Sequence, residues 1–214
     1  MRIGRSFGEW LYWKTMKPSQ THSRVGISCL FVIILLAGMT TLTSCNRSQD
    51  DIDSLQQQVW KNPENATGYM RLGNAYARTK RYNEATESYK KALAINPGLD
   101  EALHALGAVA FNQKNYTEAL GYFQKHLDRS PKDSLRLYDL GNVTMQLGQF
   151  EKAATLYSEA IENSDSFTDA HYNLAVCYIR TGRRAEAEAI YQWLLVKNNY
   201  LALSLQKHLK KETR

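Results

Sequence analysis

The sequence predicts an all-α fold built from a stack of antiparallel helix pairs. The first observation is an internal repeat of 34 residues across the second half of the chain. The second is that apolar residues recur at helical spacing within each repeat, and short polar breaks separate the helices. Such a repeat indicates a stack of similar units. The positions that repeat are a small residue (Gly73, Gly107, Gly141, Ala175), an alanine (Ala85, Ala119, Ala153, Ala187) and an aromatic residue (Tyr89, Phe123, Tyr157, Tyr191).

Aligning the chain on these positions gives four units. In the second unit, a polar break at residues 112–115 separates two predicted helices of about 13 residues, a usual helix length. Pro97 and Pro131 predict the ends of second helices, and Gly182 predicts a turn between two helices. One helix pair cannot bury its apolar face alone, so neighbouring units must pack together. The units are residues 66–99, 100–133, 134–167 and 168–201.

Both ends of the stack have sequences suited to capping helices. Residues 52–65 have the spacing of a second helix that ends in Pro63, and they are expected to cap the first unit. Residues 202–214 are expected to form a C-terminal capping helix, with Leu205 and Leu209 on one side and lysines elsewhere. Residues 45–51 are predicted to be a short polar tether.

The N-terminal segment has the pattern of an export signal. No charged residue lies between Arg24 and Arg47, basic residues precede this apolar stretch, and acidic residues follow it. This order is typical of a secretory signal, so the part that follows is expected outside the cytoplasm. An uncleaved signal-anchor helix is an alternative, because the apolar stretch is close to the length that spans a bilayer. Met16 begins a more ordinary signal than Met1 does.

Leu42-Thr43-Ser44-Cys45 resembles the bacterial lipobox, in which an aliphatic residue and two small residues precede a cysteine. The resemblance implies cleavage of residues 1–44 and acylation of Cys45 with palmitate or a similar chain, which anchors the protein to a membrane. Asn46 follows the cysteine, and by the rule for enteric bacteria it favours the outer membrane over the inner membrane. The expected location is therefore the bacterial cell envelope, facing the periplasm.

The charge does not indicate a nucleic-acid partner. The net charge is +6 over 214 residues, but residues 1–44 contain five basic residues and one acidic residue. The remainder therefore carries only +2, with both signs interspersed, which gives no basic footprint for nucleic acid.

The repeat resembles the tetratricopeptide repeat (TPR) family. The first unit matches the family pattern with Tyr69, Leu72, Gly73, Tyr76, Ala85, Tyr89, Ala92 and Pro97. Later units depart from it at single positions, for example at His126 in the second and Leu194 in the fourth. The resemblance implies a right-handed superhelix in which the first helix of each pair lines the inner face.

Family precedent predicts a partner-binding wall on the first helices. Its apolar, aromatic and methionine side chains suit an apolar peptide or helix of a partner protein. The carboxylate-tail mode known in the family is rejected, because only Asn74 fits its residues. The wall also includes Arg78 and Arg180. The predicted partner-binding residues are Met70, Asn74, His104, Ala108, Phe111, Tyr138, Asn142, Met145, Tyr172, Val176 and Ile179.

The sequence contains no pattern that predicts an enzyme. Its five histidines have no paired metal-ligand spacing, and no phosphate-binding glycine loop or nucleophile motif is present. No metal, cofactor, small-molecule substrate or nucleic acid is expected. Cys177 is expected to be a buried structural thiol.

The predicted function is a lipid-anchored TPR scaffold that binds a partner protein at the bacterial envelope, for instance in assembly of an envelope complex. The alternative is a signal-anchored inner-membrane TPR subunit of a cytochrome or peptidoglycan machinery.

Overall fold

The computed structural model describes residues 49–211 of the chain. The described residues from Asp51 onward belong to one compact unit. The predicted signal segment 1–44 and the predicted lipidation site Cys45 lie outside the described residues. Those predictions therefore stay predictions.

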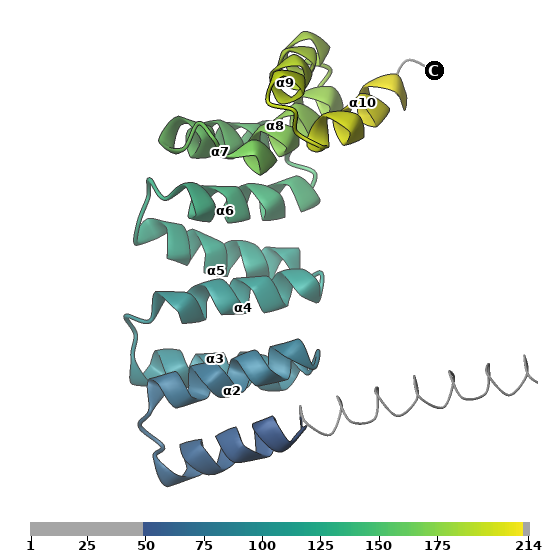
Figure 1. Ribbon diagram of the computed structural model, residues 1–214. Helices are drawn as coiled ribbons and strands as arrows, with labels where there is room; N and C mark the ends of the chain where they lie inside the picture. The colour runs from purple at the N-terminus through teal and green to yellow at the C-terminus, as the bar shows by residue number, and fades with distance from the viewer. Residues whose placement is uncertain (1–48, 212–214) are drawn as a thin grey trace, which may run out of the picture. The chain divides into compact units, whose positions relative to one another are not determined.

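Within the described residues, every regular element is a helix (Figure 1). A helix over residues 49–61, called the capping helix below, precedes the repeat units. Consecutive helices pack against each other, and α8 also contacts α10. The helices are α2 (Ala66–Arg78), α3 (Tyr82–Ile95), α4 (Asp100–Asn112), α5 (Tyr116–Asp128), α6 (Ser134–Gln146), α7 (Phe150–Asn163), α8 (Thr168–Arg180), α9 (Arg184–Val196) and α10 (Leu201–Lys211).

The fold confirms the predicted stack of four helix pairs. The first helices are α2, α4, α6 and α8, and each is followed by its partner after a short turn. The ends differ slightly from the prediction. Residues 49–51, expected in the tether, are already helical, and α10 begins at Leu201. A run of polar residues does not by itself separate a tether from the exposed start of a helix, so this boundary was hard to predict.

The repeated glycines allow first and second helices to approach closely. A Cβ atom on Gly73 would lie 2.5 Å from the Tyr89 ring, and one on Gly107 would lie 2.7 Å from the Phe123 ring. Gly141 has the same relation to Tyr157, also at 2.7 Å. The aromatic ring therefore occupies the space that a side chain at the glycine would need. This contact explains why a small residue and an aromatic residue repeat together.

The turns inside the four units share a backbone conformation. Gly148 and Gly182 have φ of 76° and 78°, which glycine adopts without steric cost. At the equivalent positions of the first two units, Lys80 and Lys114 have φ of 60° and 62°. The turn geometry is thus kept even where the residue type does not favour it.

The core runs along the stack as three neighbouring apolar clusters. The repeated alanines at the helix crossings, such as Ala85 and Ala119, are completely buried. Cys177 is also buried, and burial raises the pKa of its thiol to about 12. The thiol therefore stays protonated at neutral pH, as expected for a structural cysteine.

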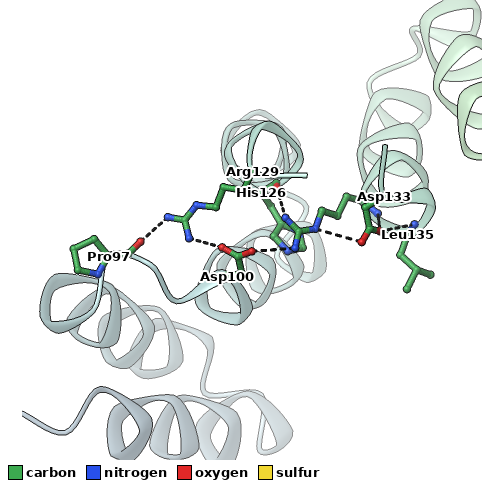
Figure 2. A network of polar contacts seen from close by, with 7 residues as sticks. Pro97, Asp100, His126, Arg129, Asp133 and Leu135 are labelled. Carbon is green, nitrogen blue, oxygen red and sulfur yellow. Dashed lines mark hydrogen bonds and ion pairs between the residues drawn. The ribbon is translucent and has the colours of Figure 1, made fainter. Parts of the chain in front are cut away.

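A polar network joins the second and third units (Figure 2). Asp100, at the start of α4, pairs with Arg129 and, at 3.0 Å, with Arg136 of α6. The Arg136 guanidinium also donates to the backbone carbonyl of His126 at 2.7 Å. Asp133 caps α6 by accepting from the backbone N–H of Arg136 at 3.1 Å. These contacts fix α6 against α4 and α5.

Candidate interaction site on the first helices

Four of the predicted partner-binding residues meet at one pocket between α4, α5 and α6. This central pocket has a volume of about 180 Å³. The predicted residues that line it are His104, Ala108, Phe111 and Asn142, and the others are Asn112, Phe123 and Asp139. The pocket is therefore part aromatic and part polar, with both hydrogen-bond donors and acceptors on its wall.

His104 and Asp139 form the charged side of the central pocket. Their side chains meet at 3.2 Å across α4 and α6. The hydrogen bond to Asp139 raises the pKa of His104 above its usual value, although partial burial opposes the shift. The His104 side chain is 50% exposed, so it remains accessible to a ligand. Its ring lies 5.9 Å from that of Phe123.

His126 lies behind His104, with ring centroids 5.6 Å apart. It is buried, and its Nδ1 has no hydrogen-bond partner among the described residues. Burial lowers the pKa of His126, and the charge of Arg136 adds to this effect. A His126 that binds a proton less readily thus lies beside a His104 that binds one more readily.

Asn142 is held in place by a hydrogen-bond network. Its Oδ1 accepts from the Tyr157 hydroxyl at 2.8 Å and from Asn173 Nδ2 at 2.9 Å. Asn173 also donates to the Tyr138 hydroxyl at 3.3 Å. Side chains fixed in this way can bind a ligand without a further loss of rotamer freedom.

The hydrogen bond between Tyr157 and Asn142 of the third unit has a counterpart in the first unit. The Tyr89 hydroxyl donates to Asn74 Oδ1 at 2.7 Å, at the equivalent repeat positions. In the second unit the same positions hold Phe123 and Ala108, which cannot form this bond. The smaller Ala108 side chain and the missing hydroxyl leave room for the central pocket.

The other predicted residues are placed differently. Met70 and Ile179 are buried in the core, where they pack against neighbouring helices. Tyr138 is half-buried and packs 4.8 Å from the Phe167 ring, measured between centroids. Met145 packs at the edge of the central core cluster. Tyr172 and Val176 pack against the C-terminal cluster, which includes α10. The predicted wall is thus not a continuous exposed surface.

Sequence reasoning missed three residues of the central pocket: Asn112, Phe123 and Asp139. Phe123 was identified only as a repeated aromatic residue, yet its side chain also lines the pocket. Asp139 lies one repeat length plus one residue after His104. That spacing could have predicted the contact, because residues about one repeat apart lie close together on adjacent first helices.

In the described residues, no group of histidine, cysteine, aspartate and glutamate side chains has an arrangement that could hold a metal ion. Within the same part of the chain, no helix has the length and apolar character needed to cross a membrane.

The stacked pairs and their exposed first-helix residues define a helical-repeat protein of the solenoid class. Tetratricopeptide repeat family models match residues 66–99, 100–134 and 138–200, together more than half of the chain. The chain therefore belongs to the tetratricopeptide repeat family.

Solved structures show the same fold. The structure of YrrB, described as a TPR protein with an unusual peptide-binding site, is 23% identical, with a TM-score of 0.65. The match covers 78% of this chain and 88% of YrrB. A MamA structure is 24% identical with a TM-score of 0.63, over 78% of this chain and 95% of MamA. MamA from Desulfovibrio magneticus RS-1 is 19% identical with a TM-score of 0.65, over 79% and 93%. No curated protein sequence matches the chain.

Proposed function

We propose that this TPR protein is an adaptor that binds a segment of a partner protein along its first helices, while a lipid on Cys45 holds it at the bacterial envelope. The observation that carries the binding proposal is the central pocket, where His104, Ala108, Phe111 and Asn142 converge. A peptide-binding site is also named for YrrB, whose fold this chain shares.

The chemistry of the central pocket suits a segment with an apolar side chain flanked by polar backbone. Phe111 and Phe123 offer aromatic surface for the side chain. Asp139 and His104 offer an acceptor and a donor for peptide N–H and C=O groups. A volume of about 180 Å³ is small for a whole ligand, so the pocket would hold one anchoring side chain of a longer segment.

Filling the central pocket tests this binding role. Ala108→Arg places a long side chain in the pocket, whereas Ala94→Arg adds the same side chain at an exposed position of α3. In cells treated with a chemical crosslinker, the protein captured by the wild type should be lost with Ala108→Arg and kept with Ala94→Arg. Capture that is unchanged with Ala108→Arg would reject the pocket as the binding site.

The anchoring part of the proposal depends on the sequence Leu42-Thr43-Ser44-Cys45. Two or more acyl chains on Cys45 would attach the protein stably to a membrane. Metabolic labelling with radioactive palmitate should label the wild type and not Cys45→Ser. An unlabelled wild type would reject lipidation and favour the uncleaved signal-anchor alternative.

A further inference from the structure

A second pocket lies at the start of the stack, between the capping helix and α2. Its volume is about 330 Å³. Ser54, Leu55 and Gln58 line it from the capping helix together with Asp51, and α2 supplies Arg71, Asn74 and Arg78. We call it the N-terminal pocket. Of its seven lining residues only Leu55 is apolar, so the pocket suits a polar ligand.

The α2 wall of the N-terminal pocket consists of hydrogen-bond donors. Neither the Arg71 nor the Arg78 guanidinium has an ion-pair or hydrogen-bond partner among residues 49–211. Arg71, Asn74 and Arg78 are spaced by three and four residues, so they share one face of the helix. Two unpaired guanidinium groups on one face can form charge-assisted hydrogen bonds to an anion.

Asn74 adds an oriented donor between the two arginines. Its Oδ1 accepts from the Tyr89 hydroxyl at 2.7 Å, so the acceptor end of the amide is already engaged. Its Nδ2 has no partner within the described part of the chain. The charge of Arg78 acts on this Tyr89 hydroxyl, opposing the burial that raises the pKa of Tyr89 to about 12. Arg78 is therefore near the Tyr89–Asn74 pair.

The same repeat positions line the central pocket, but with different charge. Arg71 corresponds to Asp139, Asn74 to Asn142, and Arg78 to Asn112. One repeat position thus has a positive charge in the N-terminal pocket (Arg71) and a negative charge in the central pocket (Asp139). The N-terminal pocket prefers an anion, whereas Asp139 makes the central pocket unfavourable for one.

We propose that the N-terminal pocket binds a carboxylate group of the partner segment, held by Arg71, Asn74 and Arg78. Asp51 leaves the pocket a net charge of +1, which suits a singly charged carboxylate better than a doubly charged phosphate. This site differs from the five-residue tail-binding mode of the family, with which it shares only Asn74. The inference rests on the proposed function only in that the carboxylate belongs to a bound protein segment.

Small carboxylates test the N-terminal pocket without any partner. The full chain, labelled with ¹⁵N and held in detergent, is titrated with N-acetylglutamate amide while the arginine Nε–Hε signals are followed by NMR. The signals of Arg71 and Arg78 should shift and saturate, and the signal of Arg184, an arginine of α9 that already pairs with Glu188 at 3.1 Å, should stay unchanged. The neutral analogue N-acetylglutamine amide should cause no shift.

The double variant Arg71→Gln, Arg78→Gln should bind N-acetylglutamate amide at least about tenfold more weakly, since charged hydrogen bonds are lost. Both residues are exposed, so this variant should fold as the wild type does, which circular dichroism checks. The control Arg184→Gln should keep wild-type affinity. A titration with N-acetylglutamine, whose only charge is its α-carboxylate, distinguishes a chain terminus from an acidic side chain as the source.

Equal shifts at all arginines, or no shift at Arg71 and Arg78, would overturn the carboxylate site. Unchanged affinity in the double variant would overturn it as well. None of these outcomes depends on the central pocket. Failure of the carboxylate site can therefore be distinguished from failure of the proposed function, which the Ala108→Arg variant tests.

Discussion

At the residue scale, the repeat is explained by a contact between a glycine of the first helix and an aromatic ring of the second. Gly73, Gly107 and Gly141 have no room for a Cβ because a ring lies within 3 Å of where it would be. A close-packed core can make room for an added methyl group only by moving the aromatic ring, which lowers the stability of the fold. These repeated sequence positions therefore serve packing, and Phe123 in addition lines the central pocket.

Two glycines of the second unit test this contact. Gly107→Ala should destabilise the protein by about 1–3 kcal/mol, because the new methyl group overlaps the Phe123 ring. Gly121→Ala is the matched control, since Gly121 is exposed on α5 with no atom within 4 Å of a new Cβ. It should stabilise the protein by about 0.5–1 kcal/mol. Urea unfolding of both variants checks the signs, and equal effects would contradict the contact.

The two histidines near the central pocket should make stability depend on pH in opposite ways. The folded-state pKa of His104 is raised by Asp139, so its contribution is complete below the unfolded pKa and is lost as pH rises through the folded value. The folded-state pKa of His126 is lowered mainly by burial, so its contribution is lost as pH falls below the unfolded value.

The urea midpoint measured against pH should separate these histidines. Asp139→Asn should remove the loss of stability above about pH 6.5, and His126→Gln should remove the loss below it, with 6.5 being the ordinary pKa of histidine. Each variant is compared with the wild type for the slope on its own side of that pH. A variant that leaves the slope on its own side unchanged would show that the histidine assignments are wrong.

At the element scale, the turns keep one geometry whatever residue they contain. Lys80 and Lys114 adopt the left-handed conformation that Gly148 and Gly182 adopt in the later units. For a residue with a side chain, this conformation costs about 1–2 kcal/mol. The turns of the first two units are therefore less stable than they would be with glycine at this position.

Replacing either lysine should stabilise its unit. Lys80→Gly and Lys114→Gly should each raise the free energy of unfolding by about 0.5–1 kcal/mol, because the relief of strain exceeds the entropy cost of glycine. The reverse change, Gly148→Lys, should lower it by a similar amount. Chemical denaturation measures all three, and a destabilising effect of both glycine variants would contradict the turn argument.

Element positions followed from the sequence, whereas contacts between units did not. Residues 66–99 were predicted as a helix pair, and α2 and α3 lie there. The Asp100–Arg136 and His104–Asp139 pairs were not predicted. They join residues that do not repeat, so periodicity says nothing about them. Burial of Met70 and Ile179 was missed for a related reason: family positions say which helix face a residue occupies, but not how closely the next helix covers it.

At the scale of the whole described stack, each unit contacts mainly its neighbours along the chain. Binding sites on such a stack are therefore separate places along it, and the two pockets differ accordingly. The N-terminal pocket has two unpaired arginines, and the central pocket has the His104–Asp139 pair beside two aromatic rings. A partner segment that engages both would carry a carboxylate at one point and an apolar side chain at another.

Because each unit contacts mainly its neighbours, a substitution that destabilises one unit should leave distant units unaffected. Leu205 of α10 is completely buried against the last unit. Leu205→Ala should cost about 2–5 kcal/mol, as large-to-small core changes do. Amide hydrogen exchange should then speed up in α8, α9 and α10 and remain unchanged in α2 and α3. Equal acceleration in all helices would mean that the stack unfolds as one unit.

Photocrosslinking in living cells tests whether the central pocket holds a segment of a partner protein. A photoreactive phenylalanine derivative is placed at His104 in the pocket or, as the control, at Glu87 on the exposed surface of α3. We expect one defined crosslinked protein from position 104, lost when Ala108→Arg is added, and none from position 87. Crosslinks from position 87 with none from position 104 would contradict it.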